Sequence, residues 1–247
     1  MIVDRGPARL ALALDTDELE TALDWARSLA HDIDCLKIGL QFYLRYGAPG
    51  VAAVREAAPE PDLFLDLKLH DIPATVRGAV RAIESLEPGY LTVHASGGSA
   101  MIAAAASALP RCRITAVTVL TSLRPMDMQQ LGLGNPADTA ARWAGVATSC
   151  GAGAVVCSAQ EAARLRPIVG DRVEIVTPGV RPADGALADQ ARVATPYEAV
   201  LAGADLLVVG RPITRAEDPV QATRAIRESM REARAVLLSG NDRVGQH

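Results

Sequence analysis

Residues 63–75 read LFLDLKLHDIPAT, a stretch typical of a β-strand that runs into a turn and then a helix. Side chains of a strand alternate between its two faces, so the four leucines share one face. Phe64, Asp66 and Lys68 share the other face. An alanine-rich, amphipathic stretch follows at 74–86. We therefore expect the leucine face to pack on helices and the charged face to point into a closed sheet.

Similar short apolar runs recur along the whole chain, starting roughly 28 residues apart. The eight runs are LALALD (10–15), CLKIG (35–39), LFLDLKL (63–69), LTVHAS (91–96), ITAVTVLT (114–121), AVVCS (154–158), EIVTPG (174–179) and LLVVG (206–210). Amphipathic stretches lie between them, and strands that alternate with helices form parallel sheets with right-handed crossovers. Eight such units in 247 residues predict an α/β fold of the (β/α)8 (TIM) barrel type.

An open doubly wound sheet is the alternative architecture. Such a sheet usually carries a G-x-G-x-x-G turn after its first strand, whereas here the first run ends in Asp15-Thr16-Asp17. No linker rich in proline or serine divides the chain. We expect residues 1–247 to form a single barrel domain, with a loose polar tail at 238–247.

The composition excludes several classes of protein. Hydrophobic residues make up 49% and charged residues 22%, which is typical of a globular protein. A net charge of −4 and a content of only 2 Trp, 4 Tyr and 2 Phe argue against nucleic-acid binding. The sequence shows neither a membrane-spanning run nor a secretion signal, and its four cysteines lack Cys-x-x-Cys spacing. We expect a cytoplasmic protein with buried, reduced thiols.

One interval between strands is longer than the others. It contains TSLRPMDMQQLGLGNPAD at 121–138, after the fifth run. Two methionines, two glycines and two prolines in this stretch predict a long mobile loop. Because it follows the carboxyl end of a strand, we expect the loop to be a lid over the functional site.

Charged residues gather where the first three runs end. Asp15 ends the first, Lys37 lies in the second, and Asp66, Lys68 and Asp71 accompany the third. Active sites of (β/α)8 barrels lie at the carboxyl ends of the strands. A buried ion-pair network that only fixes the barrel interior is the alternative, but removing charges from water costs several kcal/mol each. The number of charges at adjacent strand ends therefore favours catalysis.

The last two runs end in glycine turns that contain arginine, TPGVRP (177–182) and VGRPIT (209–214). Glycine lets backbone N–H groups approach an anion, and arginine adds a paired charge. Loops after the seventh and eighth strands form the usual phosphate site of barrel enzymes. We predict a phosphate site in which Arg211 is the direct ligand and Arg181 or Gln190 closes over it.

Six motifs together resemble the bacterial orotidine 5'-phosphate decarboxylase family. They are DLKLHDIPAT (66–75), VHASGG (93–98), VTVLTS (117–122), VVCSAQE (155–161), VTPGVRP (176–182) and VVGRPIT (208–214). The likeness runs from about residue 10 to about 230, and the D-x-K-x-x-D-I-P string is its most specific part. It implies a homodimeric lyase that converts orotidine 5'-monophosphate to uridine 5'-monophosphate (UMP) and CO2. This reaction is the last step of de novo UMP biosynthesis, and the family uses no metal or cofactor.

The resemblance also implies roles for the charged residues. Lys68, Asp66 and Asp71 match the catalytic array of the family, with Asp71 supplied by the neighbouring subunit. Asp15 and Lys37 match the pair that contacts the ribose, and Lys37 also belongs to the catalytic group. An ammonium group fixed at C6 of the base stabilises the carbanion left by CO2 and then donates a proton to it. Lys68 is the residue expected to do so.

Further residues match ligands of the substrate. Thr75 matches a ribose-hydroxyl ligand donated across the dimer. Thr121 matches a position beside the pyrimidine, a task that the adjacent Ser122 is able to share. The residues that match phosphate ligands are Arg181, Gln190, Gly210 and Arg211.

Two other functions compete with this interpretation. The same superfamily includes 3-keto-L-gulonate 6-phosphate decarboxylases and hexulose-phosphate synthases, which share D-x-K-x-x-D but need Mg2+. The continuation HDIPAT (70–75) and the strand VTVLTS (117–122) argue against them. The second alternative is a non-catalytic barrel that senses a phosphorylated nucleoside, and the intact Lys68 between two acids argues against it.

Overall fold

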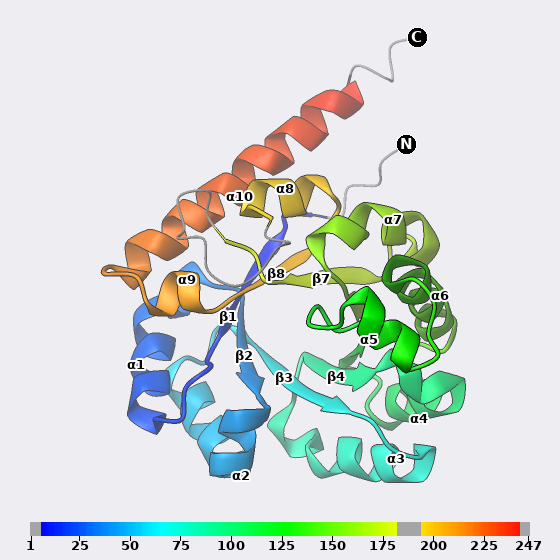
Figure 1. The fold of residues 1–247 in the computed structure, drawn as a ribbon. Coiled ribbons are helices and arrows are strands. Elements are labelled where there is room, and N and C mark those ends of the chain that lie inside the picture. The colour runs from blue at the N-terminus through cyan, green and yellow to red at the C-terminus, as the bar shows by residue number, and fades with distance from the viewer. Residues whose placement is uncertain (1–5, 182–193, 243–247) are drawn as a thin grey trace.

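The computed structural model describes residues 6–181 and 194–242, which form a closed barrel of eight parallel strands (Figure 1). The strands are β1 (Arg9–Ala13), β2 (Cys35–Gly39), β3 (Asp62–Leu69), β4 (Tyr90–His94), β5 (Arg113–Val117), β6 (Ala154–Val156), β7 (Glu174–Pro178) and β8 (Leu206–Val209). They pair in sequence order, and β1 closes the barrel by pairing with both β2 and β8. The predicted (β/α)8 architecture is confirmed, and the open sheet is excluded.

Helices surround the barrel and cover the outer face of the sheet (Figure 1). They are α1 (Leu19–Leu29), α2 (Leu40–Ala57), α3 (Pro73–Ala82), α4 (Gly98–Ala108), α5 (Pro125–Gln130), α6 (Pro136–Ser149), α7 (Ala159–Val169), α8 (Pro196–Leu201), α9 (Arg211–Thr214) and α10 (Pro219–Asp242). Short 3-10 turns occur at Ala30–Asp32, Glu84–Leu86 and Ala95–Gly97. Because all eight strands are parallel, their carboxyl ends lie at the same mouth of the barrel.

Alternation along the strands divides the apolar side chains between two cores. Leu63 and Leu65 of β3 belong to the larger core between sheet and helices. Phe64 belongs to a smaller core inside the barrel, together with Tyr90 and Val176. Because side chains alternate along a strand, the second and fourth residues after Phe64 share its inward face. They lie nearer the carboxyl end of β3, so their side chains point toward the mouth of the barrel.

Strand β3 is irregular at its mouth end. Leu65 pairs with Leu91 of β4, whereas Leu69 pairs with Val93, so four residues of β3 advance against two of β4. Lys68, inside this bulge, has a φ of 49°, in the left-handed region that residues other than glycine rarely adopt. The bulge thus places an unusual backbone conformation at the residue expected to carry the chemistry.

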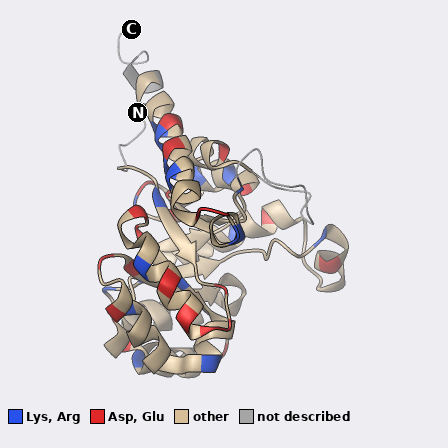
Figure 2. Cartoon of the chain, turned by 90° about the vertical axis from the view of Figure 1, so that its left-hand side faces the viewer, with Lys and Arg blue, Asp and Glu red and all other residues tan. Residues whose placement is uncertain are grey.

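The segment 121–138 is more ordered in its secondary structure than the sequence suggested. It contains α5, whose Met128 is fully buried beside Val119 and Ala140. The Arg124 backbone N–H donates to Asp127 Oδ2 at 2.8 Å, and this hydrogen bond stabilises the start of the helix. The sequence predicted a long loop here and missed α5, because a six-residue helix is too short to show an amphipathic repeat. In Figure 2, α5 projects from the mouth of the barrel.

The last helix is longer than expected. Residues 238–242, predicted to belong to a loose tail, form the end of α10, and residues 243–247 lie outside the described part. A helix that projects beyond the barrel needs no apolar partners, so the polar composition does not end it. Basic and acidic residues alternate along α10 (Figure 2). Across residues 6–181 and 194–242, no helix combines the length and apolar character needed to cross a bilayer.

Candidate active site

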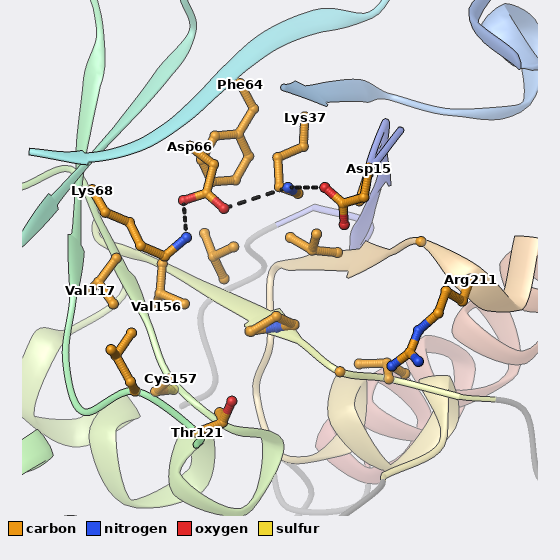
Figure 3. Close-up of a pocket in the computed structure, with 18 of the residues that line it drawn as sticks. Asp15, Lys37, Phe64, Asp66, Lys68, Val117, Thr121, Val156, Cys157 and Arg211 are labelled. Atoms are coloured by element: carbon orange, nitrogen blue, oxygen red, sulfur yellow. Dashed lines mark hydrogen bonds and ion pairs between the residues drawn. The ribbon is translucent and has the colours of Figure 1, made fainter. Parts of the chain in front are cut away.

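A cavity of about 340 Å³ lies at the mouth of the barrel, where the carboxyl ends of the strands meet (Figure 3). Its lining includes most of the residues that the sequence analysis proposed for the site. These are Asp15, Lys37, Asp66, Lys68, Thr121, Arg181, Gly210 and Arg211. They come from segments spread over almost the whole chain, and the closure of the barrel brings them together.

The remaining predicted residues lie elsewhere. Ser122 lines an adjoining pocket, which shares Thr121 with the main cavity. Asp71 and Thr75 are exposed and lie outside the lining formed by the described residues. Gln190 falls in 182–193, outside the residues that the structure describes. The structure therefore brings together the charges of three strand ends but leaves Asp71 and Thr75 on the surface of their own barrel.

The charged side chains form a row of alternating sign. The Lys68 Nζ donates to Asp66 Oδ1 at 2.7 Å, and the Lys37 Nζ lies 3.5 Å from Asp66 Oδ2. On its other side, Lys37 Nζ donates to Asp15 Oδ1 at 3.1 Å (Figure 3). The Thr92 hydroxyl of β4 donates to Asp66 Oδ1 at 2.9 Å. Asp66 is thus the centre of the row, with both oxygens engaged.

Burial and charge act in opposite directions on Asp66. Burial alone raises the pKa of this carboxyl, but the positive charges of Lys37 and Lys68 lower it. Hydrogen bonds from Lys68 and Thr92 lower it further, and the net result is a pKa below the ordinary value. Asp66 is therefore ionised at neutral pH, so that a carboxylate holds the two ammonium groups in place.

His94, at the end of β4, lies close to this row but adds no positive charge to it at neutral pH. Burial lowers its pKa, and the nearby charges of His70 and Lys68 lower it further, whereas Asp66 raises it. The rings of His70 and His94 are 5.3 Å apart. The Lys68 ammonium thus remains the cation nearest to Asp66 on this side, without competition from an imidazolium.

An apolar wall completes the cavity beside Lys68. Val117, Val156 and Cys157 line it and lie near the Lys68 side chain in Figure 3. Burial raises the pKa of the Cys157 thiol, which agrees with the expectation of a buried, reduced cysteine. The sequence analysis did not propose these side chains. For Val117 and Val156 the signal lay in the inward positions of the fifth and sixth apolar runs, which alternate as those of β3 do. Cys157 follows the end of β6, so alternation gives no signal for it.

The opposite end of the cavity is suited to an anion. Gly179 has a φ of 76°, a conformation that favours glycine, and it stands in the turn that leads to Arg181. Gly210 precedes Arg211, which lies across the cavity from Lys68 (Figure 3). Two arginines and two glycine turns at one end provide charge and accessible backbone for a phosphate group.

The fold and the site define a (β/α)8-barrel enzyme whose mouth holds a buried row of charges at one end and arginines for an anion at the other. Comparison with known proteins is more specific. The model described as "Orotidine 5'-phosphate decarboxylase / HUMPS family" matches residues 8–226, and the chain belongs to this family. The family resemblance inferred from the sequence motifs is confirmed.

Individual relatives agree with this assignment. The chain is 54% identical over 229 residues to an orotidine 5'-phosphate decarboxylase of Thermobifida fusca, with 92% of this chain and 98% of the relative covered. It is 48% identical to the enzyme of that name from Frankia casuarinae, covering 90% and 87% of the two chains. The crystal structure of orotidine 5'-phosphate decarboxylase from Lactobacillus acidophilus is 33% identical, with a TM-score of 0.78 and coverage of 90% and 99%.

Proposed function

We propose that this protein is a carbon–carbon lyase that converts orotidine 5'-monophosphate to UMP and CO2, the last step of UMP biosynthesis. The observation that carries the proposal is the Lys68–Asp66–Lys37–Asp15 row at one end of a cavity whose other end holds Arg181 and Arg211. The name shared by relatives 44–54% identical supports the substrate.

The chemistry follows from the position of Lys68. When the bond between C6 and the carboxylate breaks, CO2 leaves and the electron pair stays on C6 in the plane of the ring. A neighbouring carbonyl does not delocalise this pair, so the catalyst must stabilise it electrostatically. The Lys68 ammonium supplies a positive charge and then transfers its proton to C6. The neutral amine that remains regains a proton from water.

The surroundings of Lys68 make this charge effective. Asp66 accepts a hydrogen bond from Lys68 Nζ at 2.7 Å, which fixes the direction of the ammonium before substrate binds. Val117 and Val156 exclude water from one side and strengthen the local field. At the other end, Arg211 and Arg181 bind the phosphate, and this remote binding energy orients the base. Lys37 and Asp15 lie between the two ends and bind the ribose.

The enzyme is a homodimer of single-domain barrels in this proposal. Asp71 is only three residues from Lys68, yet it is exposed and outside the lining of its own cavity. Its neighbour Ile72 is 65% exposed, and Leu44 of α2 is 78% exposed, which leaves apolar surface for a second subunit. Asp71 and Thr75 then complete the site of the partner subunit. We place the enzyme in the cytoplasm, with a small-molecule substrate and no nucleic-acid partner.

A sugar-phosphate decarboxylase or synthase that needs Mg2+ is the competing function, since the family description covers more than one activity. The occupancy of Asp66 argues against it. Lys68 and Thr92 donate to one carboxylate oxygen, and Lys37 lies beside the other. Ammonium groups therefore stand where a divalent cation would approach, and we propose catalysis by the lysine and aspartate side chains alone.

The loss of orotidine 5'-monophosphate, followed by its ultraviolet absorbance, tests both functions. We expect the purified protein to decarboxylate this substrate equally fast before and after dialysis against EDTA. Loss of this substrate that EDTA abolishes and Mg2+ restores would contradict catalysis by side chains alone. No loss of this substrate, together with Mg2+-dependent turnover of a sugar phosphate, would support the competing function. Tight binding of the nucleotide without turnover would instead identify a non-catalytic sensor.

Substitution of the proposed phosphate ligand is expected to impair only the phosphorylated substrate. Arg211→Ala should lower kcat/KM for orotidine 5'-monophosphate. The drop should correspond to a loss of about 2–4 kcal/mol of transition-state stabilisation, the scale of a lost charge-assisted partner. Orotidine, which lacks the phosphate, should be decarboxylated by the variant and the wild type at similar rates. Arg215→Ala is the matched control, because this exposed arginine is one helical turn away and is not among the described residues that line the cavity. An equal loss for both substrates would show that Arg211 does not bind the phosphate.

A further inference from the structure

We propose that Thr92 is a positioning residue of the active site, whose single hydroxyl fixes both the Asp66 carboxylate and the backbone of Lys68. This inference rests on the proposed decarboxylation and deepens it. Thr92 lies on β4, the strand next to the charged residues of β3, and is fully buried inside the barrel.

The hydroxyl makes two hydrogen bonds of opposite direction. It donates to Asp66 Oδ1 at 2.9 Å, and it accepts from the backbone N–H of Lys68 at 2.8 Å. Asp66 Oδ1 is also the oxygen that receives Lys68 Nζ at 2.7 Å. One hydroxyl therefore constrains both ends of Lys68. It binds the Lys68 backbone N–H directly, and it reaches the Lys68 ammonium through Asp66.

The bulge in β3 explains why a side chain is needed at this place. A regular parallel pair would satisfy backbone N–H groups with carbonyls of the neighbouring strand. Between Leu65 and Leu69 the register shifts, and the Lys68 N–H donates to the Thr92 hydroxyl instead. Lys68 also holds a left-handed φ of 49°, which persists only where the surroundings enforce it. The bond from Lys68 N–H to Thr92 is one such constraint.

The same hydroxyl also affects the charge state of Asp66. The groups that face this carboxylate are Lys37 from β2, Lys68 from β3 and, more distantly, His94 from β4. Against the burial that raises the pKa of Asp66, the hydrogen bond from Thr92 acts with the two lysines to lower it. Loss of the hydroxyl therefore raises the pKa of Asp66, and the ionised form is lost at a higher pH.

Thr92 acts through other residues. It is not among the described residues that line the cavity, so we expect it to act on the substrate only through Asp66 and Lys68. Its removal should therefore change kcat and the pH profile and leave substrate affinity nearly unchanged. A residue that only stabilised the barrel would alter the melting temperature and would not move the pH profile.

The test compares Thr92→Val, Thr92→Ser and Thr115→Val in orotidine 5'-monophosphate decarboxylation over a range of pH. Valine keeps the size of threonine but removes the hydroxyl, whereas serine retains the hydroxyl. Thr115 is the matched control because it pairs with Thr92 in the β4–β5 register, is equally buried, and donates only to the Arg113 carbonyl. Circular dichroism melting establishes that each variant is folded, and Thr92→Ala replaces Thr92→Val if the latter does not fold.

We expect Thr92→Val to lower kcat by roughly 10- to 100-fold, the range for a lost hydrogen bond to a charged group, with KM nearly unchanged. Its acidic limb should lie at higher pH than that of the wild type, while the serine and Thr115 variants keep the wild-type profile. The inference is overturned if Thr92→Val behaves like Thr115→Val, or if Thr92→Ser loses as much as Thr92→Val. Absence of turnover in the wild-type protein contradicts the proposed function itself. Wild-type turnover with an unaffected Thr92→Val variant contradicts only the role of Thr92.

Discussion

Replacement of Lys68 by alanine is expected to lower the turnover of orotidine 5'-monophosphate by at least about four orders of magnitude, the scale of a lost central catalytic group. The ammonium is the group that stabilises the carbanion and donates the proton, and Asp66 fixes it at 2.7 Å. Binding of UMP should survive, because Arg181, Arg211, Asp15 and Lys37 remain. Single-turnover assays and a binding titration with UMP measure the two effects separately.

The backbone of Lys68 supplies a control for this experiment. Alanine is strained at a φ of 49°, whereas asparagine tolerates the left-handed region. Lys68→Asn should therefore be as inactive as Lys68→Ala but closer to the wild type in its melting temperature. A variant of either kind that kept its activity within about tenfold of the wild type would contradict the mechanism, because a central catalytic group contributes far more.

The second large effect is expected when two inactive variants share a dimer. Lys68→Ala and Asp71→Ala homodimers should each be nearly inactive. After co-refolding in equal amounts, about half of the dimers are mixed, and each contains one site that lacks both groups and one site that holds both. About a quarter of all sites should then be wild type, and decarboxylation should recover to about that fraction. This recovery requires Asp71 to act in the partner's cavity, in agreement with its exposure on its own barrel.

A matched mixture shows whether recovery comes from shared sites. Lys68→Ala combined with Asp66→Ala should recover no activity, because Asp66 is hydrogen-bonded to Lys68 within one barrel and neither mixed site is complete. Native mass spectrometry confirms that mixed dimers have formed. Mixed dimers of the Lys68 and Asp71 variants without activity would mean that Asp71 serves its own barrel. A monomeric wild-type protein would contradict the shared site altogether.

The sequence predicted the inward direction of Asp66 and Lys68 because one apolar face of a strand identifies the other. The leucines of 63–69 had to meet helices, and the structure places Leu63 and Leu65 in the outer core. The same argument applied to the fourth run, LTVHAS, would have placed Thr92 on the inward face beside Tyr90. A threonine between apolar residues of a strand gives no signal comparable to that of an ionisable side chain, so the sequence pattern did not single out this position.

Other features depend on pairing between strands and were beyond the reach of the sequence. Alternation assumes a regular strand, so it does not reveal that two extra residues of β3 lie between Leu65 and Leu69. The left-handed backbone of Lys68 follows from that register shift. Helix α5 was missed for a different reason, since its single buried residue, Met128, gives no period. In the proposed dimer Asp71 and Thr75 act in the partner's site, and the folding of one chain does not define the position of a second subunit.

The division between strand and loop residues at the mouth of the barrel bears on how such enzymes diversify. Asp66, Lys68 and Lys37 stand on strands β2 and β3, whose positions the closed sheet fixes. Arg181 and Arg211 follow strands β7 and β8, in segments that tolerate insertion and change of length. Mutations in those segments can alter which molecule is held without disturbing the row of charges. The barrel thus separates the inheritance of a reactive centre from the evolution of its specificity, and one ancestral arrangement of charges is able to serve descendants with different substrates.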